Sequence, residues 1–189
     1  MTHRKKLSFS AAVFTIALLF AACGRTPAQP ARLGLKLPPN ALGTSIHLQQ
    51  HLTVEREGGI AQIDIAVEVD DREVNLVGLL FGRRVLTLRY DGTELEMWRD
   101  PMVPPQLRAE DILEDLQLTL WPIESIREGL PNGWQIEEND RRRGLFWDGE
   151  LVMLIYYSGE PRWSGQVVLR NMRYQYKLTI TTALEHASQ

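Results

Sequence analysis

Residues 109–122 read AEDILEDLQLTLWP, and this stretch decides the fold that we predict. Its apolar residues recur at the spacing of one helical face, whereas its acidic residues occupy the other, solvent-facing side. The apolar set is Ile112, Leu113, Leu116 and Leu120, and the acidic set is Glu110, Asp111, Glu114 and Asp115. Acidic groups in the first turns also favour a helix through its dipole, and Pro122 ends or kinks it. The stretch therefore predicts a short amphipathic helix.

Strands are predicted on both sides of this helix. Residues 62–70 and 174–181 alternate apolar with polar side chains, which is the pattern of a half-buried strand. Asp-Gly pairs at 91–92 and 148–149 are typical of tight turns between antiparallel strands. A second short helix is expected over residues 123–130. The order is therefore a group of strands, a helical pair, and a second group of strands.

Two runs, residues 76–81 and 151–157, are apolar on both faces, and a flat sheet with one face in water does not explain them. A two-layer sandwich or a sheet curled around the helices would cover both faces. We favour curling, because the helices within residues 109–130 are the elements available to fill a concave face. The predicted fold class is mainly β (α+β): a curved antiparallel sheet forming an open, incomplete barrel, with the short helical pair as lid or plug.

A partial barrel that is too wide for its own side chains leaves an apolar cavity, and we expect inward-facing residues of the helices and the sheet to line it. The expected lining residues are Leu88, Trp98, Ile112, Leu113, Leu116, Leu120, Trp121 and Ile155. The tryptophans suit a packed core as well as a cavity wall, because both use the same residue types.

The composition excludes several classes of protein. The chain has 189 residues, of which 44% are hydrophobic, and a formal net charge of -3. That balance is typical of one ordinary globular domain and offers no broad basic field for nucleic acid. A single Cys excludes an intrachain disulfide and a zinc finger built on several cysteines.

The N-terminus has the pattern of an export signal. Arg4, Lys5 and Lys6 precede an apolar stretch over residues 7–20, which is too short to span a bilayer. The segment closes with Ala21-Ala22-Cys23, which resembles the lipobox of bacterial lipoproteins, although Phe20 stands where that pattern usually has Leu.

The lipobox resemblance implies that residues 1–22 are removed as a lipoprotein signal peptide and that Cys23 becomes the acylated N-terminus. Gly24 after this Cys, in place of Asp, implies sorting to the outer membrane, with the protein facing the periplasm. Residues 23–43 are rich in Pro and Gly and are expected to form a tether. The β domain is expected over residues 44–183, followed by a tail over 184–189.

Several strings resemble a family of uncharacterised bacterial lipoproteins linked to aryl-polyene-type lipid gene clusters. They are residues 82–92, 112–122, 155–157, 168–171 and 178–182, with the Leu120-Trp121-Pro122 helix end as the most specific. That family in turn resembles the outer-membrane lipoprotein receptor LolB and the carrier LolA. The resemblance implies an open β-barrel whose helices form a lid over a lipid-binding cavity.

In LolB a hydrophobic loop protrudes between two early strands and helps to insert acyl chains into the membrane. The corresponding place here is Leu79-Leu80-Phe81, followed by Arg83 and Arg84. An apolar tip rimmed by cations suits the interface of an anionic membrane. A buried strand end explains the same apolar residues equally well.

The sequence contains no hydrolase signature, neither a Gly-x-Ser-x-Gly elbow nor a phosphate-binding glycine loop. His47 and His51 lie in a stretch that alternates like a strand. On a strand, residues four apart are separated by about 13 Å, too far to share a metal ion. We therefore expect no enzyme, no metal ion and no cofactor.

Together these features predict an outer-membrane lipoprotein that binds or transfers a lipid, an acyl ligand or a lipoprotein in an apolar cavity. The expected partners are the outer membrane, through the N-terminal lipid anchor, the lipid or acylated ligand, and a periplasmic carrier protein. The alternative is a non-catalytic structural or accessory interaction module of an envelope assembly, in which the helices fill the barrel and leave no cavity.

Overall fold

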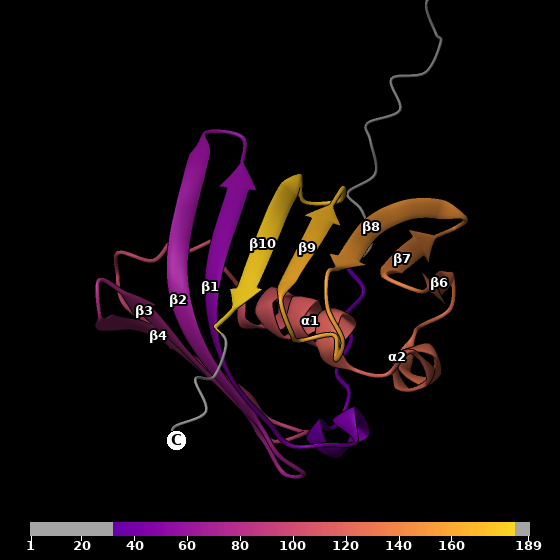
Figure 1. Ribbon diagram of the computed structural model, residues 1–189, viewed down its shortest axis with the longest axis horizontal. Coiled ribbons are helices and arrows are strands. Elements are labelled where there is room, and N and C mark those ends of the chain that lie inside the picture. The colour runs from indigo at the N-terminus through magenta and orange to yellow at the C-terminus, as the bar shows by residue number, and fades with distance from the viewer. Residues whose placement is uncertain (1–31, 184–189) are drawn as a thin grey trace, which may run out of the picture. The chain divides into compact units, whose positions relative to one another are not determined.

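The alternating stretches are strands, and all of them belong to one curved sheet. The computed structural model describes residues 32–183, and within them ten strands form a single antiparallel sheet around two α-helices (Figure 1). The strands are β1 (Ile46–Arg56), β2 (Gly59–Val69), β3 (Val74–Leu80), β4 (Arg83–Tyr90), β5 (Leu95–Arg99), β6 (Trp134–Asn139), β7 (Arg142–Trp147), β8 (Glu150–Tyr157), β9 (Gln166–Asn171) and β10 (Tyr176–Thr182). The helices are α1 (Ala109–Leu120), α2 (Ile123–Gly129) and the short 3-10 helix η1 (Pro39–Leu42).

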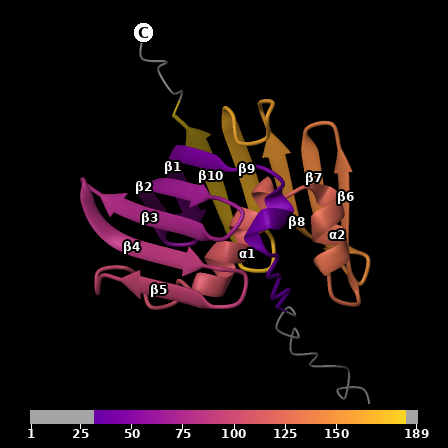
Figure 2. The same ribbon diagram turned by 90° about the horizontal axis from the view of Figure 1, so that it is seen from below.

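The order of strands in the sheet is β5-β4-β3-β2-β1-β10-β9-β8-β7-β6. The two halves of the chain therefore meet at the centre of the sheet, where β1 pairs antiparallel with β10. The segment that carries α1 and α2 connects the two edge strands, β5 and β6, which do not pair with each other (Figure 2). The sheet is thus curved but not closed into a barrel, which confirms the predicted fold class.

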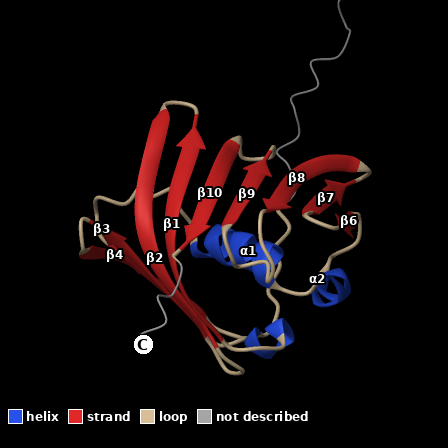
Figure 3. Cartoon of the chain, viewed as in Figure 1, coloured by secondary structure: helices blue, strands red, loops and turns tan. Residues whose placement is uncertain are grey.

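The concave face of the sheet curves around α1 (Figure 3). Residues opposite each other in register point to the same face. On the concave face this applies to the pairs Leu52–Ile180, Leu76–Leu88 and Leu145–Met153. Most of these side chains are buried, so the concave face of the sheet and the inner side of α1 form the core.

Two sheet side chains hold the C-terminal end of α1. The last carbonyl groups of a helix have no partner within the helix. Here the carbonyl of Leu118 accepts a hydrogen bond from Nη1 of Arg143 at 2.5 Å, and the carbonyl of Thr119 accepts one from the hydroxyl of Tyr157 at 2.9 Å. The Arg143 side chain is fully buried and forms an ion pair with Glu138 at 2.6 Å. Its positive charge also suits the negative end of the helix dipole.

Residues 32–43 are packed against the helices and do not form the free tether that their Pro and Gly content predicted. Leu33, Leu35 and Leu37 are buried, whereas Gly34 and Lys36 between them are exposed. This period-two burial is that of an extended segment with one apolar side. The sequence shows the alternation of leucines with Gly34 and Lys36, but prolines and glycines at this density are typical of a tether. We call residues 32–43 the N-terminal strap.

The strap runs along both helices and is fixed by their polar side chains. The fully buried amide of Gln117 accepts a hydrogen bond from the backbone N–H of Leu37 at 3.0 Å and donates one to the carbonyl of Leu37 at 2.8 Å. The Trp121 indole N–H donates to the carbonyl of Pro38 at 3.3 Å. An extended strap with no strand beside it thereby satisfies its buried backbone groups through side chains.

The convex face of the sheet is not covered by a second layer of the described residues. In β8 the side chains of Met153, Ile155 and Tyr157 are buried on the concave face, but Leu151 and Tyr156 are each 40% exposed on the other. The expectation that curling would cover both faces is therefore wrong for this strand. The apolar residues of the convex face are partly open to water.

Replacing Gln117 with Ala should lower the free energy of unfolding by about 2–4 kcal/mol, because it leaves a buried N–H and a buried C=O of the strap without partners. Chemical denaturation of Gln117→Ala measures the loss. Gln135→Ala, at an exposed position of the edge strand β6, is the matched control and should change stability little. Equal stability of the two variants would contradict this role of Gln117.

Candidate functional site

Part of the concave face is not covered by α1. Along β1, Ile46, Leu48 and Gln50 are buried, but Leu52 and Val54, which point to the same face, are only half-buried. On β2 the half-buried Ile63 is the register partner of Leu52. Apolar residues near the turn between β1 and β2 therefore keep access to solvent on the concave side.

The side of α1 that is directed towards the sheet also carries half-buried residues. Ile112, Asp115 and Leu116 lie on one helical face and are half-buried, whereas Leu113 is fully buried. This face is directed towards β10, because Asp115 is hydrogen-bonded to Tyr176 at the start of that strand. We call Leu52, Val54, Ile63, Ile112 and Leu116 the open concave surface.

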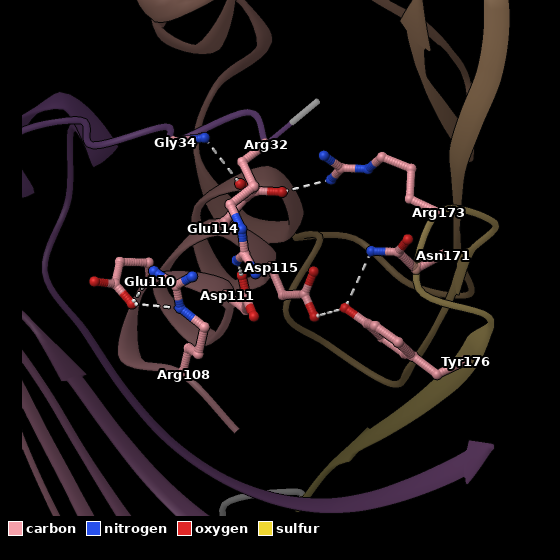
Figure 4. A network of polar contacts seen from close by, with 10 residues as sticks. All are labelled: Arg32, Gly34, Arg108, Glu110, Asp111, Glu114, Asp115, Asn171, Arg173 and Tyr176. Atoms are coloured by element: carbon pink, nitrogen blue, oxygen red, sulfur yellow. Dashed lines mark hydrogen bonds and ion pairs between the residues drawn. The ribbon is translucent and has the colours of Figure 1, made fainter. Parts of the chain in front are cut away.

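Asp115 of α1 and Tyr176 at the start of β10 form a polar pair (Figure 4). The hydroxyl of Tyr176 donates to Oδ2 of Asp115, and Nδ2 of Asn171 donates to the Tyr176 hydroxyl at 3.2 Å. Burial raises the pKa of Asp115 to about 7, and the neighbouring charge of Glu114 adds to the rise, whereas the hydrogen bond from Tyr176 opposes it. Burial also raises the pKa of Tyr176. The carboxyl of Asp115 therefore exchanges its proton near neutral pH.

The neighbouring acidic residues have cationic partners. Glu114 forms an ion pair with Arg173 at 2.5 Å, and both side chains are almost completely buried. The other oxygen of Glu114 accepts a hydrogen bond from the backbone N–H of Gly34 in the strap at 3.2 Å. Asp111 pairs with Arg32 at 3.0 Å. These contacts join the strap, α1 and the turn between β9 and β10 into one network (Figure 4).

The sequence did not reveal this network. It placed Glu114 and Asp115 on the solvent-facing side of the helix, but Glu114 is buried and Asp115 is half-buried against the sheet. The reason is that α1 is enclosed by the strap on one side and by the sheet on another. The partners Arg173 and Tyr176 lie about sixty positions away along the chain, and nothing in the local pattern of α1 points to them.

The residues expected to line a cavity occupy three different places. Leu88, Leu113, Leu120, Trp121 and Ile155 are buried in the core, Ile112 and Leu116 belong to the open concave surface, and Trp98 is 49% exposed on the convex face. Trp98 differs from the expectation because its register partner Thr87 points away from α1. Two hollows found among the described residues lie on the convex face, and neither is lined by residues of α1 or α2.

The turn between β3 and β4 presents the predicted apolar tip. Phe81 is fully exposed in this turn, with a φ of 51° that side chains other than Gly, Asn and Asp rarely adopt. Leu79 and Leu80 are half-buried. Arg83 and Arg84 follow and are exposed; Arg83 pairs with Asp100 at 2.7 Å, and Arg84 lies over the Trp98 ring at 5.5 Å from its centroid. Met102, after Asp100, is 59% exposed.

His47 and His51 lie on the convex face of β1 opposite Glu68 and Asp64, and His51 contacts Asp64 at 2.7 Å. Cys23, the expected lipidation site, lies outside the described residues. No helix within residues 32–183 is both long enough and apolar enough to cross a membrane.

Comparison with known proteins gives a family without an assigned activity. The model of a family described as a protein of unknown function (DUF3261) matches residues 47–184. Among solved structures, the chain is similar to a DUF1329 family protein from Desulfovibrio piger, with 12% identity over 80% of this chain and 90% of that chain. The TM-score of this match is 0.34. No curated protein matches the chain.

The raised pKa of Asp115 predicts a pH-dependent stability. A carboxyl whose pKa is higher in the folded state stabilises fully below its ordinary pKa of 3.8, and this contribution is lost as the pH rises through about 7. Asp115→Asn has no ionisable carboxyl at this position and does not lose this stability as the pH rises. The free energy of unfolding of the variant minus that of the parent protein should therefore increase from pH 4 to pH 8. The rise corresponds to at most about 4 kcal/mol, and the carboxyl's partial access to water reduces this to roughly 1–3 kcal/mol.

Denaturation of both proteins across this pH range measures the difference. Tyr176→Phe is the companion variant, because it removes the hydrogen bond that opposes the rise and should move the pH midpoint upward. A stability difference between Asp115→Asn and the parent that does not vary with pH would contradict the assignment.

Proposed function

We propose that this chain, which belongs to the DUF3261 family of proteins of unknown function, is a non-enzymatic outer-membrane lipoprotein that binds or transfers a lipid or acyl ligand on its open concave surface. The observation that carries the proposal is a group of half-buried apolar side chains on the concave face of the sheet and on the side of α1 directed towards β10. They are Leu52, Val54 and Ile63 on the sheet and Ile112 and Leu116 on the helix.

An acyl chain is the ligand that this surface suits. Apolar area removed from water contributes roughly 25 cal/mol per Å², and each CH₂ group contributes roughly 0.8 kcal/mol. A chain that lies between β1 and α1 removes water from its own surface and from both half-buried walls. The core around Leu113 and Trp121 is already packed and need not rearrange. Binding of the ligand would thus bury the apolar side chains that are only half-buried in the protein alone.

The contact with a membrane is proposed at two places. The acylated Cys23 would anchor the chain, with the domain facing the periplasm, where a carrier protein could deliver the ligand. The tip at Phe81 would touch the bilayer, and Arg83 and Arg84 beside it suit anionic headgroups. Phe81 supports this role because a bulky side chain at positive φ, fully in water, has no evident benefit for the fold.

A second candidate is a structural or accessory interaction module of an envelope assembly. One observation favours it: five of the eight residues expected to line a cavity are packed in the core. In that case the open concave surface would receive a protein segment in place of an acyl chain. Binding of an acyl probe at this surface separates the two candidates.

Val54→Asn should weaken binding of a fluorescent long-chain fatty acid at least tenfold, because it places a polar amide on the open concave surface. Thr53→Asn is the matched control: the neighbouring residue is equally half-buried but points to the opposite face of β1. Fluorescence titration of the purified full-length variants measures both. Failure of the parent protein to take up the probe, or equal affinities of the two variants, contradicts the proposal.

Phe81→Asn should reduce binding to vesicles that contain phosphatidylglycerol, because it removes the apolar tip. Asn tolerates positive φ better than Phe does, so thermal stability should stay the same or rise. Vesicle co-sedimentation and thermal unfolding measure the two effects. Ile60→Asn, at a 71% exposed residue near the start of β2, controls for the loss of any exposed apolar side chain. An equal reduction by both variants would rule out a specific tip.

A further inference from the structure

A hollow of about 450 Å³ lies on the convex face of β3, β4 and β5. These three neighbouring strands lie at one edge of the sheet (Figure 2). Pockets for small molecules commonly measure about 300–1,000 Å³, so this hollow is large enough, whereas the other convex hollow, at about 200 Å³, is not. Its floor is formed by Val77 and Thr87, and Trp98 lies beside them in register with Thr87.

Trp98 gives the hollow an aromatic wall. Nearly half of this residue is exposed, and it lies in one cross-strand row with Thr87 and the apolar Val77. The guanidinium of Arg84 lies over the ring, 5.5 Å from the centroid. Trp98 lines the hollow, whereas Arg84 does not. The exposed part of this large π-surface is therefore available to a ligand.

The row of convex side chains next to Val77, Thr87 and Trp98 is polar and forms the rim of the hollow. The carboxylate of Glu73 accepts hydrogen bonds from Nδ2 of Asn75 at 2.7 Å and from Nε of Arg89 at 2.8 Å. These bonds lower the pKa of Glu73, so it is ionised at neutral pH and keeps both partners oriented. Oδ1 of Asn75, the terminal nitrogens of Arg89 and the exposed carboxylate of Glu96 complete the rim. The rim thus offers both donors and acceptors.

The charges around the hollow are balanced. Arg89 forms an ion pair with Glu73. The other positively charged side chain near the hollow, Arg84, is balanced by one negatively charged side chain, Glu96. A phosphate or a carboxylate ligand would find no excess of positive charge here. An acyl chain is disfavoured as well, because the hollow is open and polar on one side and would leave much of the chain in water.

We propose that this hollow binds a pyranose unit of a neutral glycan, stacked on Trp98 and hydrogen-bonded to Asn75, Arg89 and Glu96. The C–H groups on one face of a pyranose carry partial positive charge and suit the negative face of an indole ring. The ring's hydroxyl groups both donate and accept, as the rim requires. This site is independent of the open concave surface, which lies on the other face of the sheet.

Isothermal titration calorimetry of the full-length protein tests the site, with chitotetraose, maltotetraose and a β-1,4-galactotetraose as probes. At least one of them should bind saturably at millimolar concentration or below. Trp98→Ala should weaken that binding at least tenfold, and Trp98→Phe, which keeps a smaller ring, should weaken it less. Tyr156→Ala is the matched control, because Tyr156 is 40% exposed on the convex face of β8, away from the hollow.

Absence of saturable binding to all three sugars overturns the proposal, as does equal affinity of Trp98→Ala and Tyr156→Ala. If Trp98→Ala does not fold, as judged by circular dichroism, Trp98→Phe provides the decision: unchanged affinity in that variant overturns the stacking role. A fatty-acid titration with Trp98→Ala keeps this result separate from the function proposed above, since acyl binding should be unaffected by the substitution.

Discussion

The structure depends on the hydrogen bonds by which the sheet holds α1. Arg143 and Tyr157 bind the carbonyl groups at the C-terminal end of the helix, and Tyr176 binds Asp115 in its middle. These groups are largely buried, and removal of one partner leaves the other with a desolvation penalty of about 1–3 kcal/mol or more. The helix is therefore fixed in one position in the concavity. In that position it covers the middle of the sheet and leaves the far end of β1 and β2 open.

The N-terminal strap helps to decide which part of the concavity stays open. Residues 32–43 fill the side of the helices that the sheet does not reach, and Gln117 and Glu114 bind their backbone. With the sheet on one side and the strap on another, the core around Leu113 and Trp121 is complete without a ligand. A ligand is thus not needed for folding, and the open concave surface is the part of the concavity that remains free to receive one.

The fold was predictable because its signals are local. Period-two alternation in residues 62–70 and 174–181, Asp-Gly turns and the helical spacing of Ile112, Leu116 and Leu120 each follow from a few neighbouring residues. The site was less predictable, since it depends on partners far apart in the chain. Local spacing placed Glu114 on a wet face, and only the return of Arg173 beside the helix buries it. Trp98 was assigned to the interior because hydrophobicity alone does not say which face of a strand a residue occupies.

The two faces of the sheet suit ligands of different chemistry. The concave side presents apolar walls and a carboxyl that exchanges its proton near neutral pH, whereas the convex side presents a ring and a polar rim. Native mass spectrometry of the protein extracted gently from membranes tests whether the open concave surface carries an acyl ligand. We expect a population heavier by the mass of one acyl lipid beyond the covalent anchor. A single species without added mass, which also takes up no fatty acid in solution, would contradict it.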